Sequence, residues 1–331
     1  MLKRFERLIN PFPKSDGGAP PKGLVAFVIH YSRPALLPLL VMAVLTAALS
    51  VMELAFVAWV GDLVDWLSAS DRSSFFTDHG WKLLAMGAVV VVVFPAIAFL
   101  QAALQFQTIF GNYPMLVRWM THRYILGQSL SFFQDEFAGR VSQKVMQTAL
   151  AVRETVTKIL DVGVYIVVYF VGTMVLLAQT DLLLLVPLVL WLGAYVVLLR
   201  YFVPRLGTIG EAQADARAHM TGRVVDSYTN IQTVKLFAHA DREHAYARAA
   251  MTEFLDTVHR QARLFTHMTN WLNIINSLLL ALVAGLAIWA WQGSLVSLGA
   301  ITVAIGLVMR LRNMSQWIIW EVAGLFENIG T

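Results

Sequence analysis

Long uninterrupted apolar runs constrain this chain more than any other feature. A helix needs about 20 apolar residues to cross a hydrocarbon core about 30 Å thick, and runs such as LLAMGAVVVVVFPAIAFL supply that length repeatedly. Mean hydropathy of +0.63 with only 14% charged residues lies far from the balance of a soluble domain. An outer-membrane barrel would show short alternating strands instead, so we predict an all-α membrane protein. The six predicted spans cover residues 35–60, 83–104, 162–178, 182–199, 274–291 and a run from 295 that reaches Arg310.

The distribution of Lys and Arg predicts the orientation. The 25 basic residues concentrate before span one, between spans two and three, and between spans four and five, whereas only Arg72 and Lys82 separate spans one and two. Positive residues gather on the cytoplasmic side, so both termini are predicted to be cytoplasmic. This bias accounts for the pI of about 9.4, so we expect no nucleic acid as a partner. Membrane lipids are expected to surround the spans.

Several kinds of chemistry are excluded by residue type and spacing. The chain has no cysteine, which removes disulfides, thiolate zinc sites and thiol catalysis. It contains no G-x-x-x-x-G-K-[ST] phosphate-binding loop and no G-x-S-x-G nucleophile turn. The nearest histidine pairs, such as His239 and His244, lack the i, i+4 spacing of a helical metal site. We therefore predict neither a catalytic residue nor a metal site in this chain.

The connections on the cytoplasmic side are long and keep helical periodicity. Residues 105–161 and 200–273 join their spans without Gly- or Pro-rich segments. A helix over about 79–128 would be about 75 Å long, more than twice the core thickness. Pairs of helices should therefore project into the cytoplasm and meet at short tips, SFFQDEFAG at 131–139 and VKLFAHADRE at 234–243. Phenylalanines beside charges at a tip suit a docking surface, but they could equally pack the tip itself.

These segments resemble the transmembrane half of ABC exporters with the six-helix, domain-swapped fold. LVAFVIHYSRP, residues 24–34 with Tyr31 and Pro34, is similar to that family's elbow helix, which is expected at about 23–33. GDLVD at 61–65 is similar to the end of its first helix. SFFQDEFAGRVSQ resembles the first coupling helix, and NIQTVKLFAHADRE at 230–243 resembles the second. The chain departs from the usual pattern at Thr148 and Ala240. The resemblance covers residues 23–331, and residues 1–22 are predicted to be a flexible tail.

The resemblance implies a function. Two copies would form a homodimer in which spans four and five cross to the partner, in a bacterial inner membrane. Nucleotide-binding domains using ATP and Mg²⁺ would follow residue 331 or occur on a separate polypeptide. The dimer would export a small amphipathic, lipid-like or drug-like substrate by alternating access. The residues implied to couple to those domains are Phe132, Phe133, Gln134, Asp135, Glu136, Phe137, Phe237, Ala238, His239, Ala240, Asp241 and Arg242.

Charged and aromatic residues within the spans are the candidates for a substrate cavity, namely Glu53, Arg310, Arg312, Trp317 and Trp320. Counted from the ends of the apolar runs, Glu53 and Arg310 should differ by about 20 Å in depth, which is too far for a direct ion pair. Alternatively, the arginines extend to the headgroups and Glu53 bonds within the bundle. An ion-coupled carrier or channel that uses Glu53, Arg310 and Arg312 is the alternative function, and a membrane-bound enzyme is a further one.

Overall fold

A computed structural model describes residues 2–14, 18–135, 138–236 and 240–331. Helices are the only regular structure in these residues, which confirms the all-α prediction. The chain forms two compact units. The first unit comprises Met1–Leu185 and Val283–Thr331, and the second comprises Val186–Leu282.

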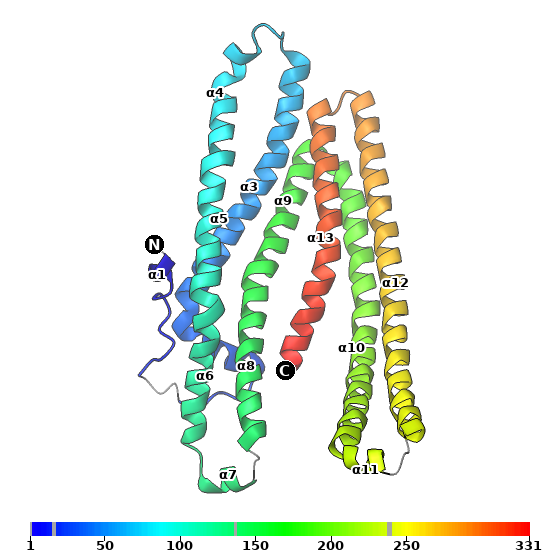
Figure 1. Cartoon of the computed structure of the whole chain (residues 1–331). Helices are drawn as coiled ribbons and strands as arrows, with labels where there is room; N and C mark the ends of the chain where they lie inside the picture. The colour runs from blue at the N-terminus through cyan, green and yellow to red at the C-terminus, as the bar shows by residue number, and fades with distance from the viewer. Residues whose placement is uncertain (1, 15–17, 136–137, 237–239) are drawn as a thin grey trace. The chain divides into compact units, whose positions relative to one another are not determined.

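The helices follow one another with short connections (Figure 1). As far as residue 229 they are α1 (Leu2–Phe5), α2 (Leu24–Ser32), η1 (Arg33–Ala35), α3 (Leu36–Ala69), α4 (Phe75–Ala88), η2 (Val89–Val93), α5 (Phe94–Ala103), η3 (Leu104–Ile109), α6 (Phe110–Leu126), α7 (Leu130–Asp135), α8 (Ala138–Thr157), η4 (Lys158–Gly163), α9 (Val164–Thr180), η5 (Leu182–Leu184) and α10 (Leu185–Thr229). The remaining helices are α11 (Ile231–Leu236), α12 (Ala240–Gln292) and α13 (Leu298–Gly330).

Within the described residues, five helical segments are long and apolar enough to cross a membrane. They contain the first five predicted spans and extend well beyond them, as the long-helix prediction required. The five segments are Leu24–Ala69, Phe75–Leu126, Val141–Thr180, Leu182–Thr229 and Arg242–Gln292. The sixth predicted span lies in α13, a helix of 33 residues that carries Arg310 and Arg312. Its crossing of the membrane stays a prediction.

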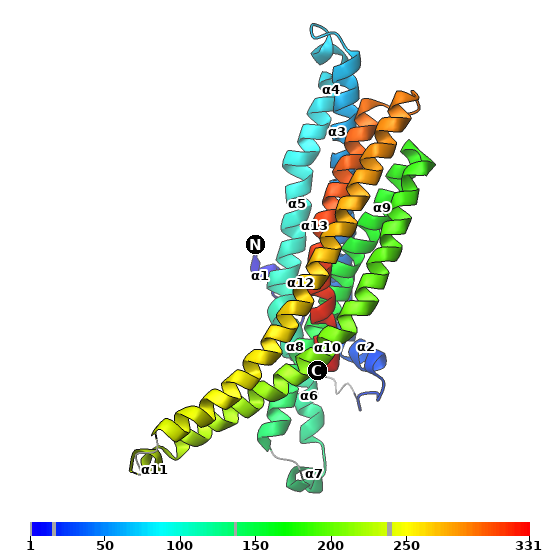
Figure 2. The ribbon, with the colours of Figure 1, turned by 90° about the vertical axis from the view of Figure 1, so that its right-hand side faces the viewer.

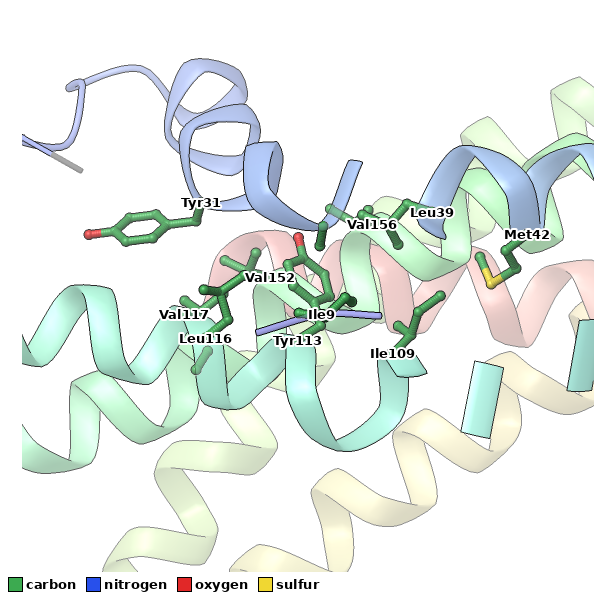
Figure 3. Packing of buried hydrophobic residues seen from close by; sticks show 12 residues of the cluster. Ile9, Tyr31, Leu39, Met42, Ile109, Tyr113, Leu116, Val117, Val152 and Val156 are labelled. Atoms are coloured by element: carbon green, nitrogen blue, oxygen red, sulfur yellow. The ribbon is translucent and has the colours of Figure 1, made fainter. Parts of the chain in front are cut away.

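The core of the first unit lies where α2, α3, α6 and α8 meet (Figure 3). Tyr31 and Leu39 from the N-terminal helices pack with Tyr113 of α6 and Val152 of α8. The Tyr113 hydroxyl lies 2.5 Å from Ser32 Oγ, which satisfies a polar group inside this apolar cluster. The elbow-like segment is thus a helix joined by side chains to the α6–α8 hairpin.

The second unit is an antiparallel hairpin of α10 and α12 closed by α11 (Figure 2). Its apolar seam includes Tyr195, Phe202 and Leu272, all buried. Trp191 Nε1 donates to Asn276 Oδ1 at 2.8 Å in the seam, and Ser227 Oγ donates to Glu243 Oε1 at 2.6 Å near the tip. The segment predicted to cross to a partner therefore has a buried seam of its own.

The first described residues differ from the predicted flexible tail. Thr108 Oγ1 donates to the Phe5 carbonyl at 2.8 Å, Asn112 Nδ2 donates to the Glu6 carbonyl at 2.5 Å, and Ile9 is 1% exposed. The tail is held because polar side chains of η3 and α6 bond its main chain, which a reading of its Pro and Gly content could not reveal.

Helices α3 and α13 approach closely through two glycines. A Cβ added at Gly299 would overlap the Gly61 carbonyl oxygen and the Asp65 carboxylate. Asp65 accepts from the Gly299 amide at 2.7 Å and from Ser297 Oγ at 2.6 Å, so it satisfies donors at the start of α13. Because neither glycine has a Cβ, the two backbones come close together, and this contact sets the register of α3 against α13.

We predict that Gly299→Ala destabilises the first unit. The added methyl must push α13 away from Gly61, and such overpacking costs about 1–3 kcal/mol. Gly285→Ala is the matched control, because nothing lies within 4 Å of a Cβ at that helical position. Thermal unfolding in detergent should give a lower midpoint for Gly299→Ala than for Gly285→Ala. Equal midpoints would contradict the close approach of α3 and α13.

Candidate functional site

Each helical hairpin ends in a short helix. Helix α7 joins α6 to α8, and α11 joins α10 to α12 (Figures 1 and 2). Before α7, the Gly127 amide bonds the Arg123 and Tyr124 carbonyls and ends α6, and Ser129 Oγ then accepts from the Phe132 amide at 3.4 Å. These local bonds stop one helix and start the next, as a sharp turn at a tip requires.

Both tips present apolar side chains outside the hairpin core. Phe132 and Phe133 touch edge to face with ring centroids 5.3 Å apart, and Phe133 remains 40% exposed. Leu236 at the end of α11 is 80% exposed. Gln134 is also exposed, and Asp135 is the last residue of α7. Apolar surface is therefore exposed at both tips, and its use as a docking surface stays a prediction.

The short helix at the second tip begins earlier in the chain than the predicted range of 234–243. Helix α11 covers Ile231–Leu236, whereas Ala240, Asp241 and Arg242 already belong to the start of α12. The other predicted coupling residues lie outside the described residues, namely Glu136, Phe137, Phe237, Ala238 and His239.

A charged cluster joins three helices of the first unit. Arg310 Nη2 lies 2.5 Å from Glu53 Oε2, and the Tyr165 hydroxyl donates to the same oxygen at 2.7 Å. Arg310 also donates to the Tyr165 oxygen at 2.9 Å. The side chains come from α3, α9 and α13, so the cluster ties one residue of each helix to the other two. Pairing lowers the cost of placing a carboxylate in an apolar span.

The separation of about 20 Å predicted for Glu53 and Arg310 is wrong. The prediction measured each residue from the end of its own apolar run, but the Gly61–Gly299 contact sets the true register of the antiparallel helices. Counted from that contact, Glu53 lies about 12 Å and Arg310 about 16 Å along the same direction. The long arginine side chain spans the small difference that remains.

Further polar contacts continue along the same face towards η4. Lys158 Nζ lies 3.0 Å from Glu321 Oε2, and Asp161 Oδ1 accepts from Thr46 at 2.5 Å and from Gln101 at 3.2 Å. Sequence reasoning missed these contacts and Tyr165. The available signal was the spacing of residues 158, 161 and 165, which places three polar residues on one helix face.

The cavity candidates on α13 fall on two faces. Arg310 and Trp317 both contact Tyr165, the latter with ring centroids 6.2 Å apart. Arg312 is exposed and, two residues after Arg310, lies on the opposite side of the helix. Trp320 is 61% exposed and lies one turn beyond Trp317. The structure therefore brings Glu53, Arg310 and Trp317 together around Tyr165, and it places Arg312 on the opposite side of α13.

The candidate site consists of paired charges and exposed helix surfaces. Over the residues that the structure describes, no group of three or more His, Asp or Glu side chains could hold a metal ion. The charged cluster is paired and holds helices together, while the hairpin tips and one face of α13 stay exposed.

Comparisons with known proteins agree with this architecture. The family model of the ABC transporter transmembrane region matches residues 39–311. A curated relative from Haemophilus influenzae, named an uncharacterized ABC transporter ATP-binding protein, is 42% identical over 327 residues. That match covers 99% of this chain and 53% of the relative, so the chain spans about half of the relative's length.

A solved structure, that of a bacterial Atm1-family ABC exporter with ATP bound, matches with a TM-score of 0.67 at 16% identity. The match covers 90% of this chain and 51% of the exporter chain, and at this identity it shows the fold alone. The fold is thus that of an ABC exporter membrane domain. With the family model matching most of its length, this chain belongs to the ABC transporter transmembrane region family.

Proposed function

We propose that this chain is the membrane-spanning half of an ATP-driven exporter that moves an amphipathic, lipid-like or drug-like substrate out of the cytoplasm by alternating access. The observation that carries the proposal is the pair of long helical hairpins that end in the short helices α7 and α11. Family membership supplies the context, because these tips need a partner outside the membrane.

The partner of the tips is a nucleotide-binding domain that hydrolyses ATP with Mg²⁺. The relative from Haemophilus influenzae supports this, since its name describes an ATP-binding protein and this chain covers only half of it. Exposed Phe133 and Leu236 offer apolar anchors for grooves on such a domain. Closure of those domains around ATP would then move α7 and α11, and the stiff hairpins would carry the motion to the spans.

The working assembly is a homodimer in which the second unit crosses to the partner. Val186–Leu282 forms a compact unit with its own buried seam, which supports exchange of this segment as a whole. A two-fold pairing encloses one pathway between two copies. The distribution of basic residues supports a cytoplasmic position for the hairpins and both termini. We assign the spans to a bacterial inner membrane.

The exposed face of α13 is the part of this chain that we assign to the substrate pathway. Arg312 and Trp320 lie on that face and offer a cation and an aromatic surface to an amphipathic molecule. Glu53 and Arg310 neutralise each other, so this pair holds α3, α9 and α13 in register rather than attracting anions.

We predict that Leu236→Glu uncouples the membrane domain from ATP hydrolysis. A carboxylate cannot enter an apolar groove without losing its hydration, which is costly. In the complete transporter, a spin label on Ser73→Cys at the end of α3–α4 should report a distance change between copies when ATP and vanadate are added. Leu236→Glu should abolish that change while ATP hydrolysis stays within about threefold of the unaltered protein.

The matched control for this experiment is Leu295→Glu, because Leu295 is 64% exposed in the connection between α12 and α13 at the opposite end of the helices. It should keep the distance change. An unaltered distance change in Leu236→Glu would remove α11 from the coupling path.

We also predict that Glu53 and Arg310 are energetically coupled. The variants Glu53→Gln, Arg310→Met and their combination form a double-mutant cycle. Thermal unfolding in detergent should give a coupling free energy of about 1–2 kcal/mol, because each single change leaves the other group without its partner.

Arg312→Ala serves as the comparison for the cycle. It should leave the unfolding midpoint within a degree or two of the unaltered protein, and should instead change which amphipathic compounds stimulate ATP hydrolysis by the complete transporter. If the changes in unfolding free energy of the Glu53 and Arg310 variants were strictly additive, the ion pair would not stabilise the first unit.

A further inference from the structure

The N-terminal segment, residues 2–14, is bound to the first unit by its main chain. The Thr108 and Asn112 side chains donate hydrogen bonds to the Phe5 and Glu6 carbonyls. Trp119 Nε1 donates to the Pro13 carbonyl at 3.2 Å. Side chains of the helix thus hold the segment at both ends through carbonyl oxygens.

One side chain of the segment faces inward. Ile9 is 1% exposed and enters the cluster that contains Tyr113, Ile109 and Val152, where Figure 3 shows it beside Tyr113. Because the main chain and Ile9 are fixed, the side chains around Ile9 are held on the outer side of the segment.

The outward side chains combine positive charge with apolar surface. Lys3, Arg4 and Arg7 are exposed, and among the described residues none of them forms an ion pair. Leu8 is 53% exposed, whereas the Phe12 ring packs edge to face on Trp119 of α6 with centroids 5.5 Å apart. Basic residues interleaved with exposed apolar ones are typical of segments that lie in a membrane interface.

The place of the segment on the helix agrees with an interfacial depth. Figure 1 shows α1 beside the α5–α6 helix, and α1 packs against η3, which begins at residue 104 where the second predicted apolar span ends. Phe106 and Phe110 on the same stretch are 59% and 58% exposed, so lipid is the natural cover of this surface. The basic side chains would therefore lie level with the cytoplasmic headgroups.

We propose that residues 3–8 form a binding surface for the anionic lipid headgroups of the cytoplasmic leaflet. Lys3, Arg4 and Arg7 contact the headgroups, and the exposed Leu8 lies beside them. The inference rests on the membrane orientation in the proposed function, but it requires neither ATP nor export. Its test can therefore fail while the exporter proposal stands.

The test uses the 331-residue chain in lipid nanodiscs. Leu8→Cys introduces the only thiol and carries a polarity-sensitive fluorophore. Discs of phosphatidylcholine are compared with discs of an equal mixture of phosphatidylcholine and phosphatidylglycerol. Emission should shift to shorter wavelength in the mixed discs at about 0.1 M salt and return at about 1 M, where the screening length falls from about 10 to about 3 Å.

Two matched triple variants locate the effect. Lys3→Gln/Arg4→Gln/Arg7→Gln should abolish the response to phosphatidylglycerol, because each basic residue near an anionic surface contributes about fivefold to the partition. Lys144→Gln/Arg248→Gln/Arg263→Gln removes the same charge from exposed positions on the hairpins and should keep the response. Equal emission in both kinds of disc, a shift that is independent of salt, or equal loss in both variants would overturn the proposal.

Discussion

The first unit depends on one constraint, which is that a carboxylate in an apolar span must have a partner. Glu53 lies within the first predicted span, and it is satisfied only where Tyr165 of α9 and Arg310 of α13 both reach the same oxygen. That requirement sets the heights of three helices at once. The close contact of Gly61 with Gly299 requires the same register nearer the start of α13, where Asp65 accepts from the Gly299 amide. Charge pairing and backbone approach therefore specify one arrangement of α3 and α13.

The same polar face continues towards the α6–α8 hairpin and connects the register of the spans to the proposed transport. Lys158 pairs with Glu321 beside η4, and Asp161 is bonded by Thr46 and Gln101 from α3 and α5. Because η4 leads directly from α8 into α9, any displacement of α7 must pass through these contacts before it reaches Tyr165. In the proposed mechanism the polar face keeps the hairpin and the spans moving as one body. The exposed face of α13, with Arg312 and Trp320, stays available to the substrate.

Much of the fold could be predicted because apolar length and helical periodicity are local properties. The runs around 83–104 and 182–199 gave correct spans, and the length of the 105–161 connection gave a hairpin with a tip near 131. The Glu53–Arg310 pair could not be found from the ends of apolar runs, since register between helices is set by contacts such as Gly61 with Gly299. The docking of residues 2–14 depends on Thr108 and Asn112, which are distant in sequence. The tip residues Phe237 and His239, which lie outside the described residues, remain predictions from the family resemblance.

The register of α3 against α13 is the central claim, and cross-linking tests it most directly. A Cβ at Gly306 would lie 3.2 Å from a Val57 methyl group, and the chain has no cysteine of its own. Mild oxidation of Val57→Cys/Gly306→Cys in membranes should therefore give an intrachain disulfide, detected by peptide mass mapping. The offset expected from apolar runs would instead place Val57 level with Ser294. Cross-linking of Val57→Cys/Ser294→Cys, with none for the first pair, would contradict the register and with it the ion pair that joins the three helices.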